Sequence, residues 1–221
     1  MLNRRHFIGL SGLSGLGLLG GCGSDEATAF VPGIEPLEAS TAGFPASTSG
    51  QQYPESLVTV TGVASGYEWV HGRAYVAAPL ARVFEAMSDP DVITDRRRVS
   101  EYSVTPDVEP MYLRSFRVRN IVRDVITLQF DMDYRFAVYD GPVGTPTSYI
   151  VRYQKVWGSS LLSVLRGSVI LRESAPGVSS LELVRHIKAV AAGRTDAEQY
   201  LRDFYASVRA RIQGMPLPTY G

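Results

Sequence analysis

Residues 124–138 alternate between apolar and polar side chains with a period of two. Successive side chains of a β-strand point to opposite faces, so the pattern predicts a strand with one buried and one wet face, as in an antiparallel sheet. A strand of this kind needs neighbouring strands and a layer that covers its apolar face. The apolar set is Ile126, Leu128, Phe130, Met132, Tyr134 and Phe136.

Other segments after residue 56 supply the partners of this strand. Strands are predicted over residues 57–63, 69–76, 99–105, 112–121, 148–157, 161–173 and 180–190. Two short helices are predicted over residues 79–87 and 92–98, and the first carries Pro79 in its first turn, where proline is tolerated.

A long amphipathic helix is predicted at the end of the chain. The run Thr195-Asp196-Ala197-Glu198 has the spacing of a capping box, and Gly214 with Pro216 would end the helix. Its apolar stripe is Ala197, Leu201, Phe204, Val208 and Ile212. We therefore expect an α+β fold, with a curved antiparallel β-sheet wrapped around a long C-terminal α-helix and two short helices after the first strand.

This order of elements resembles that of the START-related helix-grip superfamily, which includes the polyketide cyclases (SRPBCC-like proteins). The matching residues span Trp69 to Gly214 and include Tyr75–Pro79, Val83-Phe84, Asp89-Pro90 and the glycine-bearing run Leu165–Val169. The resemblance implies a cavity between sheet and helix that holds an apolar molecule. It does not imply one activity, because carriers, sensors and cyclases share the fold.

The first 22 residues have the organisation of an export signal. Arg4 and Arg5 precede an apolar, glycine-rich stretch that is too short to span a bilayer. Leu19-Gly20-Gly21-Cys22 resembles the lipobox of bacterial lipoproteins, which implies cleavage before Cys22 and acylation of its thiol. Residues 3–8 also resemble a twin-arginine motif, with Asn3 in place of the usual Ser or Thr.

Four segments follow from these patterns. Residues 1–21 are expected to be a cleaved signal peptide and residues 57–214 the helix-grip domain, followed by a tail over residues 215–221. Residues 22–56 are rich in Pro, Gly, Ser, Thr and Ala, which indicates a lipidated terminus and flexible linker. The alternative for this segment is a lid strand packed on the domain.

Charge and cysteine content exclude several classes of protein. The chain has 22 Lys plus Arg against 22 Asp plus Glu, and loss of Arg4 and Arg5 leaves 20 against 22. Such a balance argues against a nucleic-acid partner, which requires surplus positive charge. A single cysteine excludes an internal disulfide framework. We expect a bacterial envelope protein anchored to the inner or outer membrane through lipidated Cys22; the sequence does not indicate its oligomeric state.

Candidate ligand contacts come from the inward parity of the strands and the apolar stripe of the last helix. Arg185 shares parity with Leu183, and a buried arginine requires an anion, which is either a ligand head group or a carboxylate of the fold. The predicted pocket residues are Phe130, Met132, Tyr134, Val151, Tyr153, Leu165, Leu183, Arg185, Phe204 and Val208.

Two further groups of polar residues have side chains that could bind a metal ion or an anion. His71 and His186 fall on neighbouring strands, but the alternation sends both outward and no carboxylate partner is evident, so we expect surface histidines, no metal site and no cofactor. Arg96, Arg97 and Arg98 form a basic cluster near the expected cavity mouth, either as a solvated face or as contacts for an anionic ligand.

The expected function is binding of a hydrophobic small molecule or lipid without turnover. One alternative is a cyclase, dehydratase or isomerase in which Tyr134, Tyr153 or Arg185 polarises a carbonyl. The other is an envelope protein-interaction domain without a cavity. No general base is evident in the predicted pocket, which favours binding over catalysis.

Overall fold

The computed structural model describes residues 24–220, which form nine strands and three helices. The strands are β1 (Asp25–Ala27), β2 (Leu57–Ala64), β3 (Tyr67–Val76), β4 (Glu101–Pro106), β5 (Arg114–Arg123), β6 (Thr127–Asp140), β7 (Ser148–Ser159), β8 (Leu162–Ala175) and β9 (Val178–Ala189). The helices are α1 (Leu80–Met87), α2 (Pro90–Ile93) and α3 (Arg194–Ile212). No helix in this part of the chain is long and apolar enough to cross a membrane.

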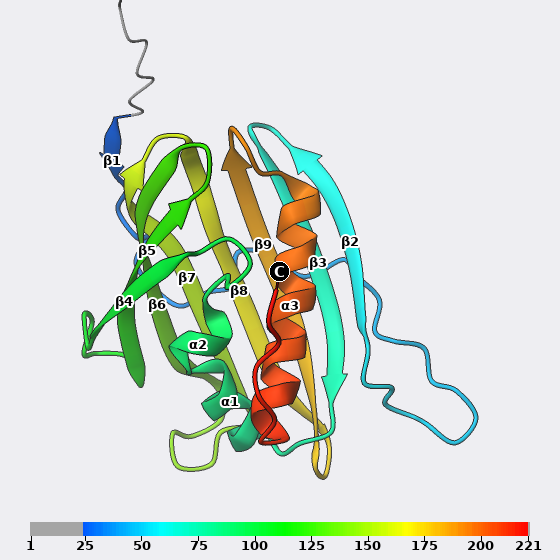
Figure 1. Cartoon of the computed structure of the whole chain (residues 1–221). Coiled ribbons are helices and arrows are strands. Elements are labelled where there is room, and N and C mark those ends of the chain that lie inside the picture. Colours follow the sequence, from blue (N-terminus) through cyan, green and yellow to red (C-terminus); the bar gives the residue numbers. More distant parts are fainter. Residues whose placement is uncertain (1–23, 221) are drawn as a thin grey trace, which may run out of the picture.

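The strands form one antiparallel sheet that curves around α3 (Figure 1). Its order is β2-β3-β9-β8-β7-β6-β5-β4, and β1 pairs separately with the end of β7. All three helices lie against the same face of the sheet, which we call the inner face, and α3 runs along it (Figure 1). The expected fold class is confirmed: the chain has a helix-grip fold.

Alternating residues of the central strands build the core on the inner face. On β6, Phe130, Met132, Tyr134 and Phe136 are buried in the main hydrophobic cluster. The same cluster takes in α3, of which Val208 is fully buried. The alternating apolar residues of the strands and the apolar stripe of α3 thus pack against each other in one layer between sheet and helix.

The helix ends differ from the sequence prediction in two places. α2 ends at Ile93 rather than Arg98, because Thr94 adopts an extended conformation and the Ile93 carbonyl accepts a hydrogen bond from the Tyr200 hydroxyl at 2.8 Å. α3 begins one residue before Thr195. Gly193 has no side chain to contribute, so only half of a capping box forms, in which Asp196 accepts from the Gly193 amide at 3.0 Å.

The chain between β1 and residue 42 lies across the outer face of the sheet, opposite α3, and then forms a loop beside the edge strand β2 (Figure 1). We call residues 28–42 the strap. Side chains of β6 and β7 hold its backbone: Arg135 donates to the carbonyls of Val31 and Gly33 at 2.7 and 3.1 Å, and Gln154 donates to that of Ala29 at 2.9 Å. Over residues 28–42 a flexible spacer is therefore the wrong description: this part of the segment packs on the sheet, as the alternative expected, but as irregular chain and not as a strand.

Candidate functional site

The space between the inner face and α3 holds a small apolar void. Its volume is about 10 Å³, enough for roughly one water molecule. It is lined by Met87, Ile93, Tyr134, Val151, Tyr153, Val169, Leu183, Tyr200, Leu201 and Phe204. A ligand larger than a water molecule can enter only if these side chains or α3 move.

Half of the ten predicted pocket residues line this void. They are Tyr134, Val151, Tyr153, Leu183 and Phe204. Four others are buried in the same core without lining the void, namely Phe130, Met132, Leu165 and Val208. The prediction omitted Tyr200, although its place one turn before Phe204 put it on the same face of the helix as the apolar stripe.

Arg185 is buried beside the void and has no carboxylate partner among residues 24–220 within 4.0 Å. Its guanidinium lies 3.6 Å from the ring centroid of Tyr200 and 6.0 Å from that of Tyr153. Its Nε atom is buried without a hydrogen-bond partner. A buried cation stabilised mainly by aromatic rings lacks the anion that usually compensates it.

The pKa values of ionisable groups near Arg185 are shifted in the directions expected for groups buried away from water. Burial raises the pKa of Asp95, and the positive charge of Arg185 opposes that shift. Burial also raises the pKa values of Tyr134 and Tyr153, so both hydroxyls are protonated at neutral pH. Burial lowers the pKa of Arg185, but the neighbouring Tyr153, Tyr200 and Asp95 outweigh this effect and leave it raised. The guanidinium therefore stays charged.

The position of the Tyr153 ring depends on a glycine in the neighbouring strand. Gly167 pairs with Tyr153 between β7 and β8, and a Cβ atom on Gly167 would lie 2.1 Å from the tyrosine hydroxyl. Only a residue without a side chain leaves room for the ring to lie over this strand. The glycine-bearing run that resembles the superfamily thus shapes the void.

The basic cluster Arg96–Arg98 contacts α3 and the C-terminal tail. Arg97 forms a bidentate ion pair with Asp203 at 2.8 and 3.1 Å, and Arg98 pairs with Asp196. Arg96 donates to the Pro218 carbonyl at 3.1 Å. Each arginine therefore has an intramolecular partner, and the cluster fixes the connection after α2 to the helix and the tail; carboxylates compensate Arg97 and Arg98, whereas the partner of Arg96 is a neutral carbonyl.

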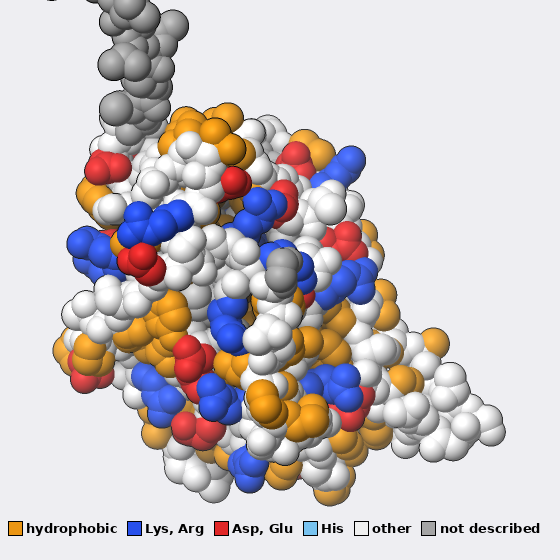
Figure 2. All heavy atoms as spheres, viewed as in Figure 1, with side chains coloured by type: hydrophobic (Ala, Val, Ile, Leu, Met, Phe, Trp, Pro, Cys, Tyr) orange, Lys and Arg blue, Asp and Glu red, His pale blue; other side chains and the backbone are white. Residues whose placement is uncertain are grey.

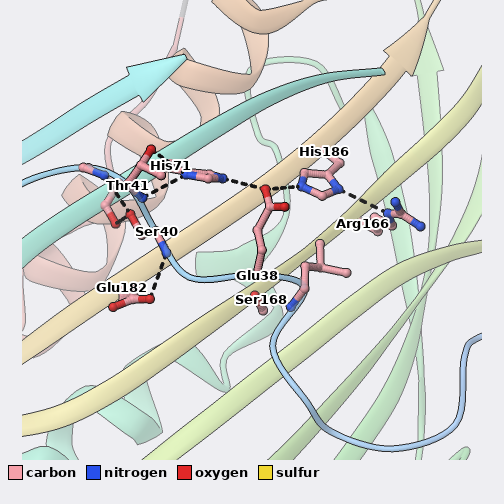
Figure 3. Close-up of polar contacts among 11 residues, drawn as sticks. Glu38, Ser40, Thr41, His71, Arg166, Ser168, Glu182 and His186 are labelled. Carbon is pink, nitrogen blue, oxygen red and sulfur yellow. Dashed lines mark hydrogen bonds and ion pairs between the residues drawn. The ribbon is translucent and has the colours of Figure 1, made fainter. Parts of the chain in front are cut away.

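A second polar cluster lies under the strap on the outer face (Figure 3). The prediction that His71 and His186 point away from α3 is correct, but the prediction that they are surface residues is wrong, since they are 3% and 2% exposed. Glu38 of the strap supplies the carboxylate that the sequence did not reveal. Its Oε1 accepts from Nε2 of His71 at 2.7 Å and from Nε2 of His186 at 3.0 Å.

The three ligand atoms lie within 4.8 Å of one another, which is close enough for a metal ion. The outer nitrogens argue against one. Nδ1 of His71 accepts from the Thr41 amide at 3.0 Å, and Nδ1 of His186 accepts from Nε of Arg166 at 3.3 Å. In a neutral imidazole that accepts at Nδ1, the proton sits on Nε2, where a metal would have to bind. The donor set therefore fits a hydrogen-bonded clasp, which we call the Glu38 clasp.

The clasp also shifts the protonation of its members. Burial raises the pKa of Glu38, but hydrogen bonds from His186 and His71 outweigh burial and leave that pKa below its usual value. Burial lowers the pKa of His186, against the opposing influence of Glu38. Both shifts favour an ionised Glu38 beside a neutral His186, the state in which the hydrogen bonds between these two residues and Arg166 form.

Comparison with known proteins gives the fold class and no closer relation. No protein-family model and no curated protein matches the sequence. Among solved structures, the human StAR-related lipid transfer protein 5 is similar to this chain with a TM-score of 0.51 and 10% identity, over 76% of this chain and 89% of that one. The chain therefore has the same helix-grip fold as that protein, which is the fold that the sequence motifs suggested.

Two bacterial structures share the resemblance at lower TM-scores. A START superfamily protein from Mycobacterium smegmatis has a TM-score of 0.47 and 14% identity, over 67% of this chain and 99% of that one. The Zhui aromatase/cyclase from Streptomyces has a TM-score of 0.45 and 14% identity, over 67% of this chain and 92% of that one.

Proposed function

We propose that this chain is a lipid-anchored envelope protein that binds a hydrophobic molecule with an acidic group between the sheet and α3. The observation that carries the proposal is the state of Arg185. It is a permanently charged side chain in an apolar core, with an unpartnered Nε and no carboxylate within ion-pair distance among the described residues. A ligand carboxylate or phosphate would supply the missing charge.

The residues that line the void would contact the apolar part of the ligand. Nearly all are apolar or aromatic, which suits the hydrophobic body of a ligand. Nearest to Arg185 are Tyr153 and Tyr200, whose rings contact the guanidinium. A ligand would therefore bind with its acidic group toward β9 and its apolar part along the void.

Binding requires the core to expand. Ligand sites for drug-sized molecules measure about 300–1,000 Å³, whereas this void holds about 10 Å³. The helices contribute five of the residues that line the void, namely Met87 on α1, Ile93 on α2, and Tyr200, Leu201 and Phe204 on α3. Displacement of α1 and α3 from the sheet is the movement that would open the site, and methionine adapts readily to such repacking.

The composition of the void favours binding over proton-transfer chemistry. None of the described residues that line it is an aspartate, glutamate, histidine or lysine. Its tyrosines have raised pKa values, which makes them hydrogen-bond donors and not bases. We therefore propose binding without turnover.

The membrane anchor is a second part of the proposal. Its support is the sequence Leu19-Gly20-Gly21-Cys22, which lies outside the described residues. Mass spectrometry of the chain extracted from a bacterial envelope tests it: acylated Cys22 at the mature amino terminus supports the anchor, and an unmodified thiol contradicts it.

Native mass spectrometry of the purified chain tests the binding site. The wild-type protein should carry a co-purifying acidic lipid or other hydrophobic acid, and Arg185→Gln should lose it. Lys188→Gln is the matched control, because Lys188 lies on the same strand with the same charge but is exposed. Absence of any adduct, or an adduct that both variants retain equally, would contradict the proposed site.

A further inference from the structure

The order of the chain in space brings the lipidation site close to one end of the sheet. The described chain is fixed from its first residue, since the Ser24 carbonyl accepts from the Ser160 amide at 2.9 Å and β1 pairs with residues 157–159 of β7. Only Gly23 separates Ser24 from Cys22. The Cα atom of Cys22 is therefore within about 7 Å of that of Ser24.

A flexible linker would place the anchor much farther from the folded domain. A random coil over residues 22–56 would place the domain about 30 Å from its anchor on average and in any orientation. With β1 and the strap bound to the sheet, the anchor is instead attached directly to the folded domain. One end of the sheet must then lie at the membrane surface.

The strand pairing shows which turns lie at the same end of the sheet as the amino terminus. Asp25 of β1 pairs with Ser159 of β7, and Phe130 of β6 pairs with Gly158 of β7, both in antiparallel orientation. The residues that precede Asp25 and the residues that precede Phe130 therefore both lie beyond the same end of β7, the end at Ser159. The β5–β6 turn thus projects from the same end as the amino terminus (Figure 1). Val125 lies in the turn that joins Arg123 to Thr127, and Ser24 is the first described residue before β1, so the turn and the start of the described chain both lie beyond Gly158 at this end.

The tip of this turn is apolar and open to solvent. Val125 is 97% exposed and Ile126 is 54% exposed. Val63, next to the last residue of β2, and Val190, in the β9–α3 connection, add exposed apolar side chains at the same end. Figure 2 shows hydrophobic side chains gathered at the top of the molecule, next to the point where the chain turns grey.

We propose that this end, defined by Val63, Val125, Ile126 and Val190, docks on the lipid bilayer and inserts the β5–β6 turn at the headgroup boundary. The inference rests on the proposed acylation of Cys22, which fixes which end of the sheet faces the membrane. This end carries charges of both signs, with Asp25, Glu26 and Asp124 against Arg123, Lys188 and Arg194. Without a surplus of basic residues it has no preference for anionic lipid, so the partner is a bilayer of largely zwitterionic lipid.

The opposite end of the sheet provides an internal control. Val143 lies in the β6–β7 connection and is 71% exposed, so it is a second valine in an exposed turn. The 12 residues of β7 separate the two ends by roughly 36 Å. A docked domain shields Val125 and leaves Val143 in water.

The experiment attaches an environment-sensitive fluorophore to Val125→Cys or to Val143→Cys in the full chain. Cys22 is the only native cysteine and its thiol is blocked by acylation, so each variant offers one site for the label. The labelled proteins are reconstituted in phosphatidylcholine nanodiscs. Cys22→Ser forms of both variants, free in solution, give the reference spectra.

At position 125 we expect a blue-shifted emission and about threefold weaker quenching by iodide on reconstitution, because side chains at the headgroup boundary are shielded from aqueous ions. At position 143 we expect no change. Equal quenching at both positions, shielding of both, or shielding of position 143 alone would overturn the docking while leaving the anchor intact. An unmodified Cys22 in the mass spectrum of the same sample would overturn the anchor and the docking together.

Discussion

Replacing Glu38 with alanine removes the acceptor that two buried imidazoles share, and we expect the strap to open more often as a result. Hydrogen bonds to a charged group contribute about 1.5–3 kcal/mol each. Glu38 makes two, at 2.7 and 3.0 Å, but its side chain is 40% exposed and water can replace part of what is lost. We therefore expect strap docking to weaken by about 2 kcal/mol.

Amide hydrogen exchange measures this effect directly. The amides of Leu37, Ser40 and Thr41 donate to side chains of the sheet, at 3.2, 2.9 and 3.0 Å, and exchange only when the strap opens. A loss of 2 kcal/mol corresponds to roughly 30-fold faster exchange at these amides. Exchange in β7 and β8 should stay unchanged.

Glu35→Ala is the matched control for this experiment. Glu35 is an exposed glutamate of the same strap, and only its backbone carbonyl takes part in a hydrogen bond, from Arg152. This variant should exchange as the wild type does. If Glu38→Ala and Glu35→Ala exchange at the same rate over residues 37–41, the Glu38 clasp does not hold the strap.

Three other changes test separate parts of the structure. The pKa values of Glu38 and His186 lie below their usual values of 4.5 and 6.5, so the unfolded chain binds more protons. The stability from His186 is present above pH 6.5 and should fall below it, which a lower melting temperature at pH 5 than at pH 7 would show, whereas the stability from Glu38 is lost only below pH 4.5. Gly167→Ala should cost about 1–3 kcal/mol of unfolding free energy in urea, because its Cβ would overlap Tyr153, whereas Gly144→Ala, with open space around it, should cost little. Arg185→Leu should stabilise the lipid-free protein by up to about 4 kcal/mol while removing the ligand, since an apolar side chain replaces an uncompensated buried charge; a melting temperature below that of the wild type would contradict this.

The inner face of the sheet could be predicted from the sequence because its signals are local. The alternation of β6 and the stripe of α3 are set by the periods of the two structures, and the apolar side of each faces the core as predicted. Two parts of the β6 prediction are wrong: Ile126 precedes the strand and is exposed, and the polar side expected to be wet is buried from Asp131 to Arg135. Tyr200 was missed although it follows the same helical period, and the short length of α2 depends on a tertiary contact with this same residue.

The packing on the outer face could not be predicted, because the strap that covers it has no regular spacing of apolar residues in the sequence. The strap is held by side chains of the sheet that donate to its backbone carbonyls, and backbone acceptors leave no mark on the sequence. Glu38 lies more than 30 residues from His71 in a segment whose composition is typical of linkers. One available signal was the polar face of β6 and β7, where Asp131, Asp133, Arg135, Arg152 and Gln154 are buried.

The central claim is that Arg185 provides the anion site for a hydrophobic ligand. The direct measurement is a fluorescence titration of the purified, delipidated chain with 11-(dansylamino)undecanoic acid and, separately, with its methyl ester, which has the same apolar body without the charge. We expect the acid to bind about tenfold more tightly than the ester, as one hydrogen-bonded charge pair implies, and the difference to disappear in Arg185→Gln but not in Lys188→Gln. Equal affinity for acid and ester in the wild type, or no binding of either, would contradict the account.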